Sequence, residues 1–215
     1  MSPAPHLRPR RDRLVQTPRV AVLVETSSTW GRNVCAGVQQ YAARHGPWLV
    51  FIEPRGGEEP ITLPHGWRGD GVIARINNPR LASELVSLKI PTVNVSGIRI
   101  SENPFPCVTT DLSASGRMAA QYFLDRGFRS FAYFSLLGLH YVMTHQQAFA
   151  ETLRERGHPC AVYSVKPRRG AEPDWNLDLS ALGAWLKSLP KPVAVLSWNA
   201  GGSREVLFAC QQAGL

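Results

Sequence analysis

The sequence predicts an α/β protein built from parallel sheets with helices on both faces. Short apolar runs rich in β-branched residues alternate with segments of helical periodicity along the chain, which is the pattern of βαβ units. The run Val20 to Val24 is apolar throughout, as expected for a buried strand. A new run of alternation starts near Ser130. We therefore expect a basic, disordered tail over residues 1–18 and two α/β blocks over residues 19–128 and 129–215.

The stretch from Arg19 to Gly46 predicts a strand, a hydroxyl-rich loop and a helix. A polar turn of four hydroxyl residues, Thr26-Ser27-Ser28-Thr29, comes after the apolar run. Hydroxyl side chains are favoured at a helix N-terminus. Gly46 stands where a C-terminal glycine is expected. In open α/β sheets ligands bind off the carboxyl ends of the strands, so this loop is the first place to look for a ligand.

The remaining elements follow from the same signals. In the first block we expect strands at 48–53, 72–74, 92–96 and 107–110, and helices starting at Pro79 and spanning 112–126. Asp111 caps the second of these helices, and Met118, Ala119, Tyr122 and Phe123 are predicted to face the core. In the second block we expect strands at 130–135, 160–165 and 193–197, and helices ending at Gly157 and spanning 179–189 and 204–213.

Composition excludes several classes of protein. Among the 215 residues, 44% are hydrophobic and 19% are charged, as in ordinary globular proteins, and no apolar run is long enough to span a bilayer. The basic N-terminus lacks the apolar stretch of a secretory signal, so we expect a cytoplasmic protein. The net charge of +8 would suit a nucleic-acid partner, but four arginines crowd the tail and no DNA-binding motif is present.

The sequence lacks the usual signatures of enzymes and metal sites. The four cysteines are scattered, which predicts buried free thiols, and the histidines show no metal-binding spacing. Phosphate-binding loops, dinucleotide motifs and nucleophile elbows are absent. Asp70, Asp111 and Asp178 lie near the ends of elements, where an aspartate commonly caps a helix or a turn. We therefore expect no enzyme activity, no cofactor and no metal.

Polar and aromatic residues gather where several predicted strands end. Arginine and asparagine can bond paired hydroxyls, and tryptophan or tyrosine can stack on the apolar face of a ring. Together these residue types are typical of a sugar site. The predicted ligand-binding residues are Ser28, Trp30, Arg32, Arg75, Asn77, Tyr141, His145 and Asn199.

Five stretches carry a resemblance to a known family: TWGRNVCAGVQQYA, WRGDGVIARI, IPTVNVSG, VTTDLSASGRMAAQYFLDRGFRSFAYF and PVAVLSWNAGGSREVLFACQQAGL. In this order they resemble the effector-binding domain of xylose-operon regulators. These are AraC-type transcription factors whose sensor is similar to LacI and to periplasmic sugar-binding proteins. The resemblance implies a two-lobe periplasmic-binding-protein-like (type I) fold with an incomplete second lobe, and a xylose-like sugar effector bound as the lobes close. It also implies DNA binding only through downstream helix-turn-helix motifs, a homodimer formed mainly by the first lobe, and no membrane partner.

The family pattern carries over residue by residue, with two departures. Trp30, Gly31 and Arg32 match the aromatic-Gly-Arg of the first loop, and Asp70, Arg75 and Asp111 match positions at the third strand and the crossover. His145 stands where the family usually has an arginine, and Ala200 where it usually has an aspartate. In such sites that arginine and aspartate hold sugar hydroxyls. The departures leave open whether this sensor reads another ligand or has lost sensing.

Two alternatives remain open at this point. A truncated, stand-alone binding or interaction protein would keep the first lobe and its dimer surface without binding DNA. A small α/β enzyme acting on a sugar or nucleotide would need a convergent acid/base pair, which the sequence does not offer.

Overall fold

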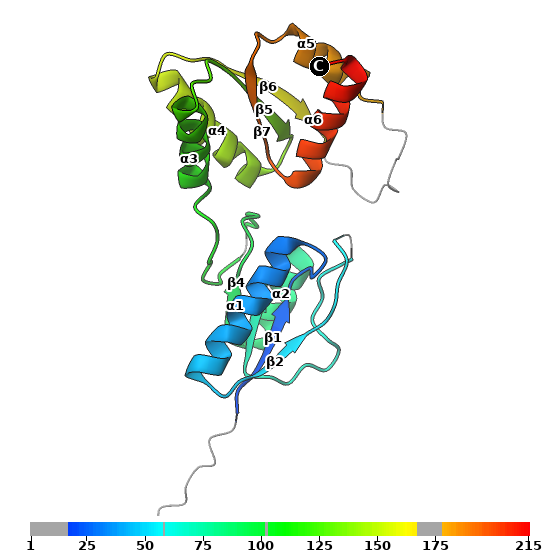
Figure 1. Cartoon of the computed structure of the whole chain (residues 1–215). Coiled ribbons are helices and arrows are strands. Elements are labelled where there is room, and N and C mark those ends of the chain that lie inside the picture. Colours follow the sequence, from blue (N-terminus) through cyan, green and yellow to red (C-terminus); the bar gives the residue numbers. More distant parts are fainter. Residues whose placement is uncertain (1–16, 58, 102, 167–177) are drawn as a thin grey trace, which may run out of the picture. The chain divides into compact units, whose positions relative to one another are not determined.

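The computed structural model describes residues 17–57, 59–101, 103–166 and 178–215 (Figure 1). Residues 1–16 of the predicted tail lie outside this description. The chain forms two compact units, each with its own parallel sheet. One unit contains the described residues up to Arg75 together with Ser83–Val93, and the other contains Ile76–Ala82 and Asn94–Leu215.

The sheet of the first unit has the strand order β2-β1-β3-β4. Its strands are β1 (Arg19–Leu23), β2 (Leu49–Ile52), β3 (Gly71–Ala74) and β4 (Thr92–Asn94). β1 pairs in parallel with both neighbours, and Val20 lies opposite Val50 and Gly71. Four of its five residues are buried, which explains why the run reads as continuously apolar. The predicted parallel sheet is confirmed.

Helix α1 (Thr29–His45) ends as predicted at Gly46, although for a different reason. Gly46 has an extended backbone rather than the left-handed conformation of a typical C-terminal glycine. A Cβ added there would lie 2.7 Å from Trp48 Cδ1 and 2.9 Å from Ala42 O. Glycine is needed at this position because the chain turns back closely over the end of the helix. Helix α2 (Pro79–Leu88) begins at its proline, as predicted.

The strand predicted at 107–110 is wrong. This segment makes a single parallel bridge, between Asn94 and Cys107. Residues 107–111 are all exposed, and Val108 retains 65% of its accessible surface. Because the segment has no apolar face to bury, nothing extends the pairing beyond one bridge.

The second unit places a three-stranded parallel sheet between two pairs of helices (Figure 1). The strand order is β6-β5-β7, with β5 (Ser130–Leu136), β6 (Cys160–Val165) and β7 (Val193–Ser197). Helices α3 (Leu112–Asp125) and α4 (His140–Glu155) cover one face. Helices α5 (Ser180–Ser188) and α6 (Ala200–Ala213) cover the other.

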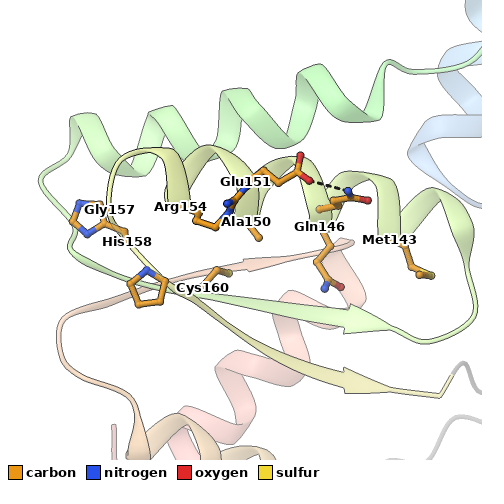
Figure 2. Close-up of a pocket in the computed structure, with 10 residues that line it drawn as sticks. Met143, Gln146, Ala150, Glu151, Arg154, Gly157, His158 and Cys160 are labelled. Atoms are coloured by element: carbon orange, nitrogen blue, oxygen red, sulfur yellow. Dashed lines mark hydrogen bonds between the residues drawn. The ribbon is translucent and has the colours of Figure 1, made fainter.

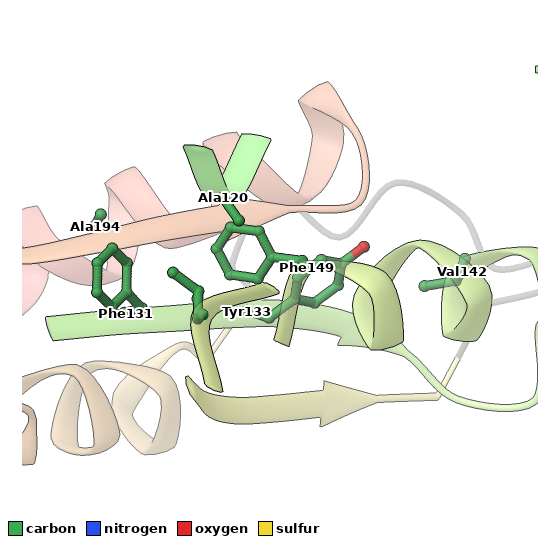
Figure 3. Close-up of a cluster of buried hydrophobic side chains, with 7 residues drawn as sticks. Ala120, Phe131, Tyr133, Val142, Phe149 and Ala194 are labelled. Carbon is green, nitrogen blue, oxygen red and sulfur yellow. The ribbon is translucent and has the colours of Figure 1, made fainter. Parts of the chain in front are cut away.

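Alternate residues of β5 supply the cores on its two faces. Phe131 and Tyr133 pack with Phe149 of α4 and with Ala120 of α3, as Figure 3 shows. Phe134 points to the opposite face, into a cluster with residues of α5 and α6. This period of two is the pattern expected of a central strand covered on both sides.

The predicted core face of α3 is wrong at two positions. Met118 is 70% exposed and Tyr122 is 51% exposed, whereas Gly116 and Ala120 are buried. A Cβ added to Gly116 would lie 2.4 Å from His145 O, so the absence of a side chain lets the two helix backbones meet. Small residues therefore mark the buried face of this helix. Helix α3 packs against α4 and belongs with it to the second unit.

Two smaller expectations are corrected as well. Helix α6 begins at Ala200 rather than at residue 204, because the Asn199 side chain caps it. All four thiols are free, but Cys107 is exposed and only Cys35 is buried. No helix within the described ranges is long and apolar enough to cross a bilayer.

Candidate functional site: two clusters at the strand ends

The loop after β1 is organised by Ser28. Its Oγ accepts a hydrogen bond of 3.0 Å from Gly31 N and so caps α1. Arg32 closes the loop from its exposed side, since its guanidinium donates to Thr26 O at 3.2 Å and to Ser27 O at 2.7 Å. Both side chains are therefore engaged in holding the loop in shape. A ligand would have to share them with the backbone.

A partly buried ion pair joins this loop to the end of β3. Arg75 Nη1 donates to Glu25 Oε1 at 2.7 Å, and the side chains are 27% and 9% exposed. The Arg75 guanidinium also lies over the ring of Trp30, 5.5 Å from its centroid, in a cation–π contact. Trp30 itself is 37% exposed. We call Glu25, Trp30 and Arg75 the first-unit cluster.

Glu25 is the residue that sequence reasoning missed. It is 7% exposed, and its Oε2 has no hydrogen-bond partner within the described residues. The available signal was a single charged residue directly after an apolar strand. Burying a carboxylate is costly unless it is paired, so a glutamate there predicts a cation nearby. The partner lies 50 positions away along the chain, where the strand order alone brings it close.

Asn77 is not part of the first-unit cluster. Its Oδ1 accepts a hydrogen bond of 2.8 Å from the amide of Asn78. Asn78 in turn accepts from Leu81 N at 2.9 Å, at the start of α2. Of the predicted residues in this part of the chain, the structure thus brings Trp30 and Arg75 into contact. Ser28 is linked to them by Glu25, because its Oγ lies 3.4 Å from Glu25 Oε1. Arg32 and Asn77 are not in this contact and form hydrogen bonds with their own loops instead.

A second cluster gathers aromatic rings in the second unit. Tyr141 and Trp198 are in edge contact with ring centroids 5.1 Å apart, and His145 contacts Trp198 at 5.6 Å. Tyr141 and Trp198 are half-buried, whereas His145 is buried. We call these three residues the second-unit cluster. Two of the predicted ligand residues, Tyr141 and His145, therefore meet on one ring, that of Trp198.

Both ring nitrogens of His145 face protein hydroxyls. Nδ1 lies 2.7 Å from Tyr133 Oη, and Nε2 lies 3.4 Å from Ser115 Oγ. Burial lowers the pKa of His145 and raises the pKa of Tyr133 far above its usual range, because both charged forms are disfavoured away from water. The buried imidazole is therefore held between two hydroxyls and the ring of Trp198.

Substituting His145 should change how stability depends on pH. The unfolded chain has an ordinary histidine pKa of about 6.5, above that of the folded state, so protonation favours unfolding. The stabilising effect of neutral His145 is complete above that value and declines as the pH falls through it. Urea denaturation of the wild type between about pH 5 and pH 7.5 should show a free energy of unfolding that rises with pH, and His145→Gln should flatten the rise. His140→Gln, at an exposed position, is the matched control. An unchanged slope in His145→Gln would contradict this assignment.

Asn199 serves as the cap of α6. Its Oδ1 accepts a hydrogen bond of 2.8 Å from Gly202 N, and the residue is exposed beside Trp198 in sequence. The amide nitrogen Nδ2 has no partner among the described residues. Asn199 can therefore donate to a ligand while its oxygen holds the helix.

The candidate catalytic carboxylates are occupied by backbone groups. Asp70 accepts from Arg19 N at 2.7 Å, and Asp111 accepts from Ala114 N at 2.8 Å as the cap of α3. Asp178 accepts from Ser180 N, a bond that lowers the pKa of its carboxyl. The interpretation as a cap or turn residue is confirmed for Asp111 and Asp178, whereas Asp70 instead binds the backbone of Arg19, 51 positions away. In the part of the chain that the structure describes, no three metal-ligating side chains lie close together.

A hollow of about 780 Å³ lies elsewhere, along α4 and the start of β6 (Figure 2). Gln146, Arg154, His158 and Cys160 are among its lining residues, and none of the predicted ligand residues lines it. Burial raises the pKa of the Cys160 thiol to about 12, so it is a poor nucleophile at neutral pH. Because the hollow lies at the amino end of β6, it is not the strand-end site that the fold predicts.

Two family models match the chain in succession. Residues 19–113 match the model of the XylR N-terminal domain, and residues 120–215 match that of the periplasmic binding protein-like domain. Together with the two parallel α/β units, these matches show that the chain has a periplasmic-binding-protein-like fold. The predicted fold class is confirmed.

Within that class, the chain is similar in sequence to the xylose operon regulators. The xylose operon regulatory proteins of Haemophilus influenzae and Escherichia coli K12 are 26% identical to it over 200 residues, which is 90% of this chain. The chain spans about half the length of these relatives, 51% and 50%. They are transcription regulators rather than enzymes.

Solved structures agree on the fold. The structure of the xylose-binding transcription activator XylR matches with a TM-score of 0.76 at 24% identity, over 94% of this chain and 52% of its own. A periplasmic binding protein/LacI transcriptional regulator from Alkaliphilus metalliredigens, complexed with D-xylulofuranose, matches with a TM-score of 0.61 at 15% identity. The latter match covers 92% of this chain and 73% of that one.

Proposed function

We propose that this chain is the ligand-sensing part of a transcription regulator and that its effector is a xylose-like sugar. Homology to the xylose operon regulators supports the role in regulation. The observation that carries the ligand class is the first-unit cluster, in which Arg75 is fixed by Glu25 and lies against Trp30. Guanidinium N–H groups bind ring hydroxyls, and an indole face packs on the apolar side of a sugar.

Replacing Arg75 should weaken sugar binding, and it should also lower the stability of the first unit because it leaves Glu25 buried without its cation. Removing a charged hydrogen-bond donor from a site costs about 1.5–3 kcal/mol, which corresponds to an affinity loss of about 10- to 100-fold. Isothermal titration of the 215-residue chain with D-xylose should show this loss in Arg75→Ala. Arg44→Ala, an exposed substitution at the end of α1, should leave the affinity unchanged. Equal affinities in wild type and Arg75→Ala would remove Arg75 from the site.

In this proposal the protein acts by binding, through a shift between conformational states. A ligand changes such an equilibrium only as far as it binds one state better than the other. The sugar would favour one state of the sensor, and that state would change the position of DNA-binding helices in the rest of the regulator. The regulated promoter contact would thus lie outside these residues, and the protein would work in the cytoplasm.

We further propose that the protein forms a homodimer through its first unit. Tyr41 on α1 and Val86 and Leu88 on α2 are large apolar side chains that are 50%, 45% and 40% exposed. Such side chains are commonly covered in oligomers. Sedimentation of the purified chain tests this, and a monomer at micromolar concentration would contradict it.

A stand-alone binding protein, which would use the same clusters without binding DNA, is the second candidate. Sequencing the coding DNA beyond Leu215 separates the two candidates. A reading frame that continues into helix-turn-helix motifs supports the regulator, and a stop codon supports the stand-alone protein.

A further inference from the structure

We propose that Glu25 makes the first-unit cluster selective for uncharged sugars over anionic ones such as sugar acids. This inference rests on the proposed sugar site and concerns which sugars it accepts. Glu25 is a positioning residue, since it acts through Arg75.

The first step concerns the charge of the cluster. The Arg75 guanidinium is 27% exposed and would by itself attract a carboxylate or phosphate group, as arginines do in anion sites. Here its Nη1 is bonded to Glu25 Oε1 at 2.7 Å. The ion pair has no net charge, so it offers hydrogen-bond donors without attracting an anion.

The second step concerns the remaining oxygen of Glu25. Oε2 is buried and has no partner within the described residues, while the whole residue is 7% exposed. A carboxylate oxygen only accepts hydrogen bonds, so it can be satisfied by a hydroxyl or water and not by another anion. A ligand carboxylate placed against Arg75 would lie close to this negative charge and be repelled.

The third step accounts for the other charges of the loop. Arg32 is the second cation there, and its guanidinium donates to Thr26 O, Ser27 O and Thr29 Oγ1. Those bonds hold the Arg32 guanidinium on the exposed side of the loop. No other charged side chain is bonded to Glu25 or Arg75 in the part of the chain that the structure describes. Selectivity by charge therefore depends on Glu25.

The test compares two sugars that differ only in the group at C5. D-Glucose has a hydroxymethyl group there and D-glucuronate has a carboxylate, and both share the ring hydroxyls of D-xylose. Titration calorimetry would measure the affinities of all three for the 215-residue chain, for Glu25→Gln and for Glu53→Gln. Glu53→Gln is the matched control, since Glu53 also pairs with an arginine, Arg55, but is 56% exposed at its side chain.

We expect the wild type to bind the neutral sugars and to reject D-glucuronate. In Glu25→Gln the cluster keeps the uncompensated charge of Arg75, so the ratio of glucuronate to glucose affinity should rise about tenfold or more. Glu53→Gln should leave the ratio unchanged. Arg75→Gln should move the ratio in the opposite direction, which keeps the test valid if Glu25→Gln folds poorly. A merely structural role of Glu25 would reduce both affinities and leave their ratio alone.

The outcomes separate the inference from the function on which it rests. Sugar binding with a ratio that neither substitution moves, or wild-type binding of D-glucuronate as tight as that of D-glucose, overturns the selectivity while the sugar site stands. If none of the three sugars binds any variant, the proposed function fails and the inference fails with it.

Discussion

Phe149→Ala is expected to lower the free energy of unfolding by about 3–5 kcal/mol. Phe149 lies on α4 with no exposed surface, in the centre of the cluster shown in Figure 3. Its ring contacts those of Phe123 and Tyr133, with centroids 6.1 and 5.8 Å apart. Removing it leaves a cavity that neither neighbour can fill, because the backbones of α3 and α4 already meet at Gly116.

Urea denaturation followed by circular dichroism measures this effect. The matched control is Phe208→Ala on α6, where the ring is 53% exposed and the loss should stay below about 1 kcal/mol. A loss in Phe149→Ala no larger than that of the control would show that this cluster is not the core of the second unit.

Gly31→Ala is expected to destabilise the first unit and to disrupt the first-unit cluster. A Cβ at this position would lie 1.7 Å from Glu25 O, which is backbone and cannot rotate away. The chain at Glu25 or the start of α1 must therefore move, and the ion pair with Arg75 moves with it. We expect a loss of about 2 kcal/mol or more in stability, and a fall in D-xylose affinity.

The same helix supplies a control substitution whose expected change in stability has the opposite sign. Gly37 is exposed in the middle of α1, and a Cβ there meets nothing within 4 Å. Gly37→Ala should stabilise the protein by about 0.5–1 kcal/mol, because alanine is the better helix former. If both substitutions stabilise, the close approach of Gly31 to Glu25 does not exist in solution.

Most of the fold could be predicted because its signals are local. β6 and β7 have the predicted bounds, Cys160–Val165 and Val193–Ser197, since each is a short apolar run that follows a proline. The cap at Asp111 was equally clear, because the carboxylate stands directly before a run of helical period. The run of hydroxyl residues 26–29 marked the start of α1 without showing that Ser28 is its cap.

The errors arise where distant contacts outweigh local pattern. Met118 and Tyr122 have the right spacing for a core face, yet the structure buries Gly116 and Ala120 because close approach to α4 needs small residues. A hydrophobic pattern shows which residues are apolar, but it does not show how closely the neighbouring helix packs.

The candidate site was only partly predictable for the same reason. Trp30 and Arg75 were recognisable as residues at strand ends, but their contact depends on β1 lying next to β3. The engagement of His145 by Tyr133 and Ser115 depends on three separate elements meeting. Side chains that act locally could be assigned, and those that act through a distant partner could not.

The double use of cap residues limits how the effector preference of this sensor could be redesigned. Ser28 and Asn199 hold the first turns of α1 and α6, and removing such a cap costs about 0.5–2 kcal/mol. Trp30 caps nothing and is 37% exposed, so substitutions there should affect the scaffold less. Arg75 also caps nothing, but replacing it would leave the buried Glu25 without its cation. Directed evolution of a biosensor from this chain should therefore accumulate changes at Trp30 first, and reach Ser28, Arg75 or Asn199 only after the scaffold has gained stability.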